Sequence, residues 1–134
     1  MQPPERIKNG ALWVRHCRRI HARAQDFLDG RLGVILAARA FQPLVIWTHA
    51  EADPDLAVFL RIDEESSSLP VGAVRERWAP HALVPYDIKI TSIEVKWQTA
   101  AWDAATNLVR RYAWALEARR ALRKTRPNDG LSSN

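Results

Sequence analysis

Apolar residues in the last third of the chain recur at the spacing of an α-helix. They form two neighbouring rows that together cover about half of a helix circumference, wider than the roughly 100° stripe of an ordinary surface helix. We therefore predict one continuous helix from Pro85 to Lys124, with neighbours on more than one side. The first row comprises Ile90, Ile93, Trp97, Ala101, Ala104, Leu108, Tyr112, Ala115 and Leu122, and the second comprises Val95, Trp102, Val109 and Leu116.

The N-terminal segment carries a narrower apolar face with the same period. The pattern predicts a helix from Glu5 to Asp29, after which Gly30 is a natural C-terminal cap. Its apolar face consists of Trp13, Cys17, Ile20, Ala24 and Phe27, at steps of three or four residues.

A second helix is predicted from Leu32 to Phe41, and Pro43 should end or kink it. The apolar run 44–47 fits one more helical turn or a buried strand, because periodicity does not separate these alternatives in a short run. Residues 58–62 alternate weakly and could be extended. A strand over 88–95 is the alternative to a helix at the start of the long C-terminal element.

Between residues 49 and 72 the helical pattern is lost. Asp53, Pro54 and Asp55 have the composition of a turn, and three consecutive serines follow at 66–68. We predict a long irregular loop from Asp53 to Gly72, laid over one end of the molecule, and a short helix over 71–78. Loops of this length in compact domains are usually functional or disordered.

Together these elements predict a mainly α-helical single domain over residues 1–127, with about four helices bundled around the long C-terminal helix. Residues 128–134 are expected to be a disordered tail. A helix of about 39 residues would be about 58 Å long, whereas a compact domain of this size is about 36 Å across. We therefore expect the helix to overhang the body or to pair with a second copy, which predicts a homodimer through the C-terminal helix.

The composition narrows the class of protein. Lys and Arg number 20 against 15 Asp and Glu, which gives a net charge of +5, and hydrophobic residues make up 47%, enough to exclude wholesale disorder. One cysteine excludes an intrachain disulfide. The chain shows no secretory signal pattern and no apolar run long enough for a membrane span. We expect a cytoplasmic protein that does not enter a membrane.

Acidic residues gather in the middle of the chain. They could supply oxygen ligands to Mg²⁺ or Ca²⁺, although their spacing matches no EF-hand loop. Alternatively, Asp53 and Asp63 could cap turns or short helices while the other acids pair with Arg61, Arg75 and Arg77. A third possibility is a docking surface for a basic protein partner. We expect capping and pairing inside the protein to be the main role of these acids. If they have a functional role, docking of a partner is preferred, and we predict no metal site. These residues are Asp53, Asp55, Asp63 and Glu65.

Cationic residues crowd both ends of the chain. Such clusters could contact phosphates and give salt-dependent binding to nucleic acid. No helix-turn-helix signal, aromatic-rich sheet motif or zinc knuckle accompanies them, so nucleic acid is the alternative partner and not the preferred one. The two clusters are Arg15, Arg18 and Arg19 in the first predicted helix and Arg119, Arg120 and Arg123 in the last.

Five of the six tryptophans are expected in the core, and Trp114 is the exception. It lies off both apolar rows of the long helix, so it could anchor a protein partner or a dimer. His16 and His21 are five residues apart, which is not the spacing that puts two imidazoles on one metal. Cys17 falls on an apolar face and is expected to be a core residue. We predict no catalytic residue and no cofactor.

One stretch of the chain resembles a known group of sequences. The pattern Asp53-Pro54-Asp55, Phe59, Ile62-Asp63-x-Glu65, Leu69-Pro70-Val71-Gly72, Arg75 and Trp78 is similar to an uncharacterised family of small bacterial cytoplasmic proteins. The similar region extends from about residue 27 to residue 97. The family has no established activity, so the resemblance implies an intact fold and no particular chemistry. The chain departs from the family pattern at residue 64 and at 66–68.

These observations favour a non-enzymatic protein-interaction module, in particular an immunity-type protein that neutralises a toxin partner. The alternative is a basic, oligomeric protein associated with nucleic acid. A metal-dependent enzyme centred on the acidic residues is the least favoured hypothesis.

Overall fold

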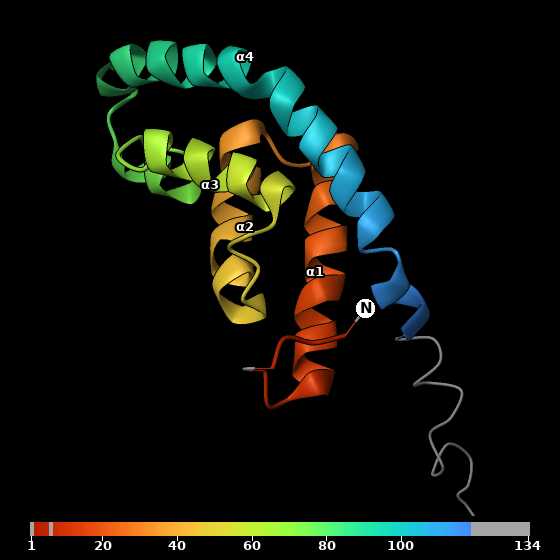
Figure 1. The fold of residues 1–134 in the computed structure, drawn as a ribbon. Coiled ribbons are helices and arrows are strands. Elements are labelled where there is room, and N and C mark those ends of the chain that lie inside the picture. Colours follow the sequence, from red (N-terminus) through yellow and green to blue (C-terminus); the bar gives the residue numbers. More distant parts are fainter. Residues whose placement is uncertain (1, 6, 119–134) are drawn as a thin grey trace, which may run out of the picture.

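The protein is almost entirely helical in a computed structural model, which describes residues 2–5 and 7–118 (Figure 1). The α-helices are α1 (Gly10–Leu28), α2 (Val34–Thr48), α3 (Pro54–Ser66) and α4 (Pro80–Arg111), with a 3-10 helix, η1 (Gly72–Arg77), before α4. One further helical turn covers 114–118. No strand occurs in the described ranges, which confirms the predicted all-helical class and removes the strand alternatives at 44–47, 58–62 and 88–95.

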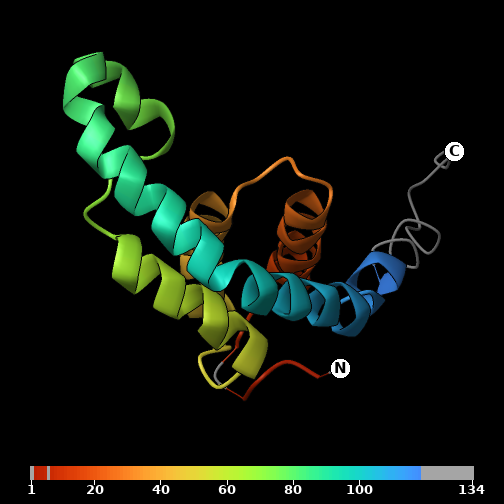
Figure 2. The ribbon, with the colours of Figure 1, turned by 90° about the horizontal axis from the view of Figure 1, so that it is seen from above.

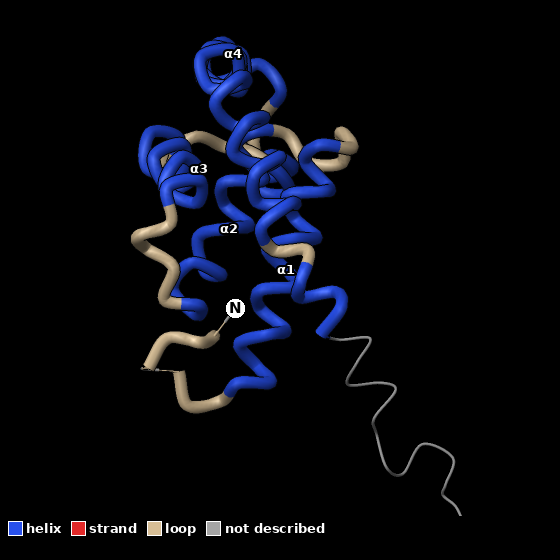
Figure 3. Tube along the Cα trace, turned by 45° about the vertical axis from the view of Figure 1, so that its right-hand side comes forward, coloured by secondary structure: helices blue, strands red, loops and turns tan. Residues whose placement is uncertain are grey.

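α1 and α2 form an antiparallel hairpin, and α3 packs against α2 (Figure 1). α4 arches over the connected end of the hairpin and then descends along α1 (Figures 1 and 2). α4 contacts all three other α-helices, as predicted for the C-terminal helix. The tube view shows the helices joined by short loops (Figure 3).

The core lies where these four helices meet. The rings of Phe41 and Phe59 have centroids 4.6 Å apart, and Phe27 meets Phe59 edge-on at 6.0 Å. Leu108 from α4 is fully buried, and Cys17 from α1 is buried among the same side chains. Burial of each large apolar side chain stabilises the fold by about 1.5–3 kcal/mol. Burial also raises the pKa of the Cys17 thiol to about 12, as expected for a core cysteine.

The long loop predicted from Asp53 to Gly72 is wrong, because most of it is α3. The side chain of Asp53 caps this helix by accepting hydrogen bonds from the backbone N–H groups of Asp55 and Leu56. Pro54 occupies the first turn, where its missing N–H costs nothing. The residues that looked like a turn are therefore a helix start. The helix buries Leu56, Phe59, Ile62 and Ser66 on one side.

Two other predicted boundaries differ from the structure. α2 does not end at Phe41 but continues through Pro43 to Thr48, because Phe41 before the proline and Leu44 and Val45 after it are all buried. α1 begins at Gly10 and not at Glu5, since Asn9 accepts a hydrogen bond from the N–H of Leu12 and caps the helix there.

The single long C-terminal rod is also wrong within the described residues. α4 starts five residues before Pro85 and ends at Arg111, and a turn at Tyr112 and Ala113 separates it from the helical turn at 114–118. The first half of the second apolar row lacks the expected neighbour, because Val95 is 74% and Trp102 is 46% exposed, whereas Val109 packs against the core. The predicted domain end at residue 127 and the tail at 128–134 lie outside the described part of the chain.

Candidate functional site

The acidic residues singled out in the sequence occupy opposite ends of α3. Asp53 and Asp55 lie at its start, and Asp63 and Glu65 lie in its last turns. Asp55 and Asp63 are separated by about 12 Å of helix axis. No cluster of three or more His, Cys, Asp or Glu side chains that could hold a metal ion occurs among the described residues.

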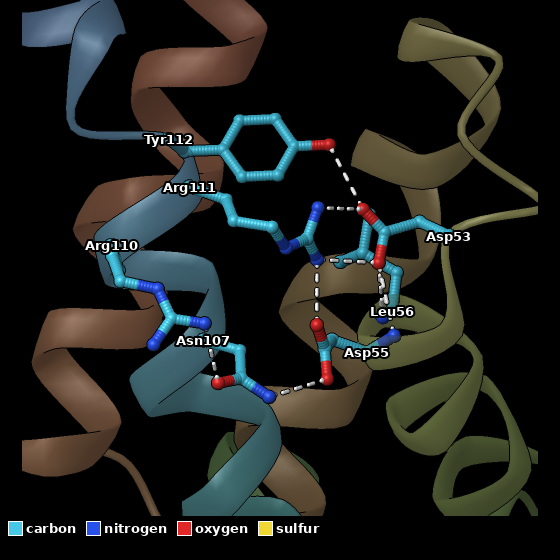
Figure 4. A network of polar contacts seen from close by, with 7 residues as sticks. All are labelled: Asp53, Asp55, Leu56, Asn107, Arg110, Arg111 and Tyr112. Carbon is cyan, nitrogen blue, oxygen red and sulfur yellow. Dashed lines mark hydrogen bonds and ion pairs between the residues drawn. The ribbon is translucent and has the colours of Figure 1, made fainter.

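Asp53 and Asp55 are bound by Arg111 at the end of α4 (Figure 4). Arg111 Nη1 donates to Asp53 Oδ2 at 2.9 Å, and Nη2 donates to Asp53 Oδ1 at 2.8 Å and to Asp55 Oδ2 at 2.7 Å. Asn107 Nδ2 donates to Asp55 Oδ1 at 3.1 Å, and the Tyr112 hydroxyl contacts Asp53 Oδ2 at 3.3 Å. We call these five residues the Arg111 clamp.

The electrostatics of the Arg111 clamp favour its charged form. Burial opposes ionisation of Asp53, but hydrogen bonds from Arg111 and from the backbone of Leu56 outweigh burial and hold the pKa of Asp53 below its usual value. The hydrogen bond to Asp53 raises the pKa of Arg111. Burial, followed by the negative charge of Asp53, raises the pKa of Tyr112. The clamp therefore joins α3 to the end of α4 as a charged, largely buried pair.

The other two predicted acids pair separately. Glu65 accepts hydrogen bonds of 2.8 Å from Lys96 Nζ and from the indole N–H of Trp97, and these bonds lower the pKa of Glu65. Asp63 lies 4.0 Å from Arg39 Nε. All four acids therefore face cations of the protein itself, as expected for internal pairing. The partners are Arg111, Arg39 and Lys96, so the predicted partners Arg61, Arg75 and Arg77 are wrong. Their role in docking a partner stays a prediction.

Trp114 lies in a different environment from the exposed one predicted. The turn at Tyr112 directs it onto α1, where its ring stacks on Trp13 with centroids 5.2 Å apart and planes at 26°. Trp114 is half-buried, and its indole N–H is buried with no hydrogen-bond partner in the described structure. Its role as a partner anchor stays a prediction.

Arg15 and Arg19 are exposed on α1, and Arg18, which is half-buried, has a polar partner. Neither Arg15 nor Arg19 makes an ion pair or side-chain hydrogen bond with any residue in the described ranges. The C-terminal cluster at residues 119, 120 and 123 lies outside the described residues. The two clusters are therefore not shown to form one basic surface.

Trp47 is the exposed tryptophan of the α1–α2 hairpin, although it was expected in the core. It is 49% exposed near the C-terminal end of α2, beside Ile46, which is 53% exposed. Leu12 on α1 is 39% exposed, and these side chains border an open hollow of about 480 Å³. Residues from the start of α1 and the end of α2 line the hollow. Figure 1 shows that these two helix ends lie at the end of the hairpin opposite to its connecting loop.

A second hollow of about 440 Å³ adjoins the first one at Trp47. Its walls include Arg19 and Arg23 from α1 and Pro43 from α2. The two hollows share Trp47 as a lining residue and are both lined by side chains of α1 and α2. The first is lined mainly by apolar side chains, and the second has Arg19 and Arg23 on one wall. We call the two hollows together the Trp47 groove, and the side chains that define it are Leu12, His16, Arg19, Arg23, Ile46 and Trp47.

The Trp47 ring packs against the ring of His16, and the two ring centroids are 4.9 Å apart. Burial, and then the charges of Arg19 and Arg15, lower the pKa of His16. Near neutral pH the imidazole therefore adds no positive charge to the groove, whose cations are Lys8, Arg19 and Arg23. Because α1 and α2 are anchored by the core, the half-exposed indole is held in place without a partner.

A signal for the exposure of Trp47 was present in the sequence. If α2 is continued through Pro43, then Leu36, Ala40, Pro43 and Trp47 fall on one row of the helix, and this row points away from the buried face. If the helix is ended at Pro43, as predicted, Trp47 is no longer in register with this row. The expectation that Trp47 belongs to the core was therefore wrong.

α4 presents a second exposed apolar surface. Val84, Ile88 and Val95 are 56%, 67% and 74% exposed on its outer side. A second copy of the chain would cover this surface in the predicted homodimer, which stays a prediction.

Comparison with known proteins gives no assignment, since no family model, no curated protein and no solved structure matches the chain. Among the described helices, none combines the length and the apolar character needed to cross a membrane. What the protein binds is therefore inferred from its own surface chemistry.

Proposed function

We propose that the protein is a non-enzymatic protein-interaction module that binds its partner through the Trp47 groove. The observation that carries this proposal is the half-exposed Trp47, flanked by exposed Ile46 and Leu12 at the mouth of an open hollow. Tryptophan is enriched among the residues that dominate binding energy at protein interfaces. Contiguous apolar side chains rimmed by polar ones are typical of such sites.

The state of the acidic residues supports a binding role over a chemical one. Asp53 and Asp55 are held by Arg111, and Glu65 is held by Lys96 and Trp97. These carboxylates stabilise the fold, whereas the side chains around Trp47 have exposed surface to offer a partner.

An immunity-type role is the biological setting that we propose for this module, with a toxin as the partner. Such pairs are expected to be encoded by adjacent genes. We expect co-expression to protect cells from the neighbouring gene product, and Trp47→Ser to lose the protection. A neighbourhood without a toxin-like gene would contradict the immunity role and leave the binding role standing.

The proposal is tested by comparing what three forms of the protein retain from a lysate of the organism that carries the gene. We expect a discrete partner on the wild type and on the control Val95→Ser, whose substitution lies on α4. The double variant Ile46→Ser/Trp47→Ser should lose it. Equal retention by all three forms, or no retention by the wild type, would contradict the proposal.

Binding to nucleic acid is a second candidate, supported by Arg15 and Arg19, which are exposed and make no ion pair with the described residues. Arg19 also lines a hollow together with Trp47. Single-stranded nucleic acid combines phosphates for cations with bases that stack on aromatic rings. Binding to random-sequence DNA that weakens steeply with salt would support this candidate. Absence of binding at low salt would remove it.

A further inference from the structure

The Trp47 groove is asymmetric along its length, and this asymmetry bears on its occupant. At the end formed by the start of α1 and the end of α2, the exposed side chains are Leu12, Ile46 and Trp47. At the other end, Arg19 and Arg23 form one wall. These arginines are one helical turn apart, so their guanidinium groups can meet two carboxylates spaced by one turn of another helix.

Two of the three cations that line the groove are not balanced by an acidic partner among the described residues. Arg19 has no acidic partner among the described residues, and neither has Lys8 at the apolar end. Arg23 is bound at one nitrogen by Asp26 at 3.0 Å, while its Nε is buried without a hydrogen-bond partner in the described structure. The groove therefore attracts anionic groups, and at the end formed by Arg19 and Arg23 two guanidinium groups lie one helical turn apart.

We propose that the Trp47 groove receives an acidic amphipathic helix of the partner protein. Its apolar side chains fill the hollow beside Trp47, and its carboxylates, one turn apart, pair with Arg19 and Arg23. This inference rests on the proposed function, since it specifies the partner segment of the same site. Helix-in-groove recognition of this kind reads apolar anchors at helical spacing.

The length of the groove fits such a segment. Leu12 and Arg23 are eleven positions apart on α1, which corresponds to about 16 Å, or three turns of a helix. An apolar anchor in the first turn of a bound helix therefore lies about two turns from the carboxylates that meet the arginines.

The surface chemistry disfavours two other occupants. The C-terminal segment from residue 119 onward contains five cations among its first eight residues, so the arginines would repel it. A nucleic acid would use the cationic end but would leave Ile46 and Leu12 without an apolar counterpart. Charge complementarity over the whole groove therefore favours an acidic protein segment.

The test uses synthetic helical peptides of about fourteen residues that contain leucine and glutamate. In the designed peptide, leucines occupy one half of the apolar face and glutamates the other half, and a second peptide reverses this order. The controls are a scrambled peptide of the same composition, a peptide with lysine in place of glutamate, and oligothymidylate. Calorimetry measures affinity, and the shift of the Trp47 indole N–H signal in NMR spectra locates binding.

We expect one of the two segregated peptides to bind at least about tenfold more tightly than the scrambled one, and to shift the Trp47 signal. Trp47→Ser should weaken this binding by about tenfold or more, whereas Trp102→Ser, which removes a similarly exposed indole from α4, should not. Arg19→Glu/Arg23→Glu should transfer the preference to the lysine peptide. Circular dichroism verifies that each variant is folded.

Three results would overturn the proposal. They are equal affinity for the scrambled peptide, stronger binding of the lysine peptide or oligothymidylate to the wild type, and unchanged preference in the charge-reversed variant. If no peptide binds while the wild type still retains its partner through Trp47, the acidic-helix inference is wrong and the proposed function stands. If that retention also fails, the proposed function is wrong as well.

Discussion

The carboxylates of α3 and the arginines of α1 were both conspicuous in the sequence, but the fold uses them differently. Asp53 and Asp55 meet Arg111 within 2.9 Å and help to hold α4 against α3. Arg15 and Arg19 stay exposed and make no ion pair within the described ranges. A charged side chain that is already paired inside the fold gains little by binding a partner, because its internal interaction would first have to be broken.

This contrast moves the candidate site from the acidic segment to the α1–α2 seam. Docking by the acidic residues was the expectation from charge density alone. The geometry gives stronger support to the Trp47 groove, where exposed apolar and cationic side chains adjoin. Clusters of charge in a sequence thus indicate candidate binding sites. The pairing of these charges in the structure then shows which cluster is available to bind a partner.

The largest effect is expected from Arg111→Met, which keeps the apolar stem and removes the guanidinium. It leaves two partly buried carboxylates without their cation, so we expect the free energy of unfolding to fall by about 2–3 kcal/mol. The matched variant Arg19→Met should change it by no more than about 0.5 kcal/mol. Urea unfolding followed by circular dichroism measures both. Similar losses in the two variants would show that the arginines of α1 and of the Arg111 clamp contribute equally to stability, which would contradict the comparison.

Asp53→Ala removes the helix cap of α3 together with the ion pair. We expect a loss of about 2 kcal/mol in the free energy of unfolding, of which about 1 kcal/mol belongs to the cap. Asp53→Asn keeps the cap and should therefore lose about half as much. The same urea titration separates the two contributions. Identical losses for both variants would show that the cap contributes nothing.

The tryptophans provide a matched pair in the two kinds of environment. Trp114→Ala removes a ring stacked on Trp13, and we expect a loss of about 1.5–2 kcal/mol. Trp47→Ala removes a ring that is half exposed, and the expected loss is below about 1 kcal/mol. Thermal unfolding of the two variants ranks them. If Trp47→Ala is the more destabilising, Trp47 is a structural residue and the groove loses its anchor.

The smallest expected effect is a change in how the free energy of unfolding depends on pH under acidic conditions. The folded-state pKa of Asp53 lies below its usual value of 3.8, so the unfolded chain binds this proton first as pH falls. The stabilisation is complete above about pH 4 and is lost as pH falls through the lowered pKa. Asp53→Asn should therefore show a shallower loss of stability below pH 4. Urea titrations between about pH 2 and pH 7 measure the slope, and parallel curves would contradict the assignment.

Much of the fold was predictable from the order of apolar residues. The period of three to four residues in Trp13, Cys17, Ile20, Ala24 and Phe27 identified the buried face of α1, since burial requires that these side chains share one side of a helix. The start of α3 was predictable as well, because an aspartate before a proline is a helix-start signal. The same residues are also typical of turns, and that interpretation led to the wrong prediction of a loop.

Other features depend on contacts between residues far apart in the chain. Nothing local ends α4 at Arg111, since Tyr112 and Ala113 are not helix breakers. The end coincides with the bonds of Arg111 and Tyr112 to Asp53 and with the stacking of Trp114 on Trp13. α2 passes through Pro43 because the buried residues on either side of it offset the lost hydrogen bond.

The helical class, the apolar faces and the presence of opposite charges therefore follow from composition and period alone. Which charges are paired and which aromatic rings are exposed depends on how the helices assemble. Pairing and burial depend on which helices lie side by side, and no single segment of the chain carries that information. The Trp47 groove, formed by helices that meet across the hairpin, is a product of that assembly.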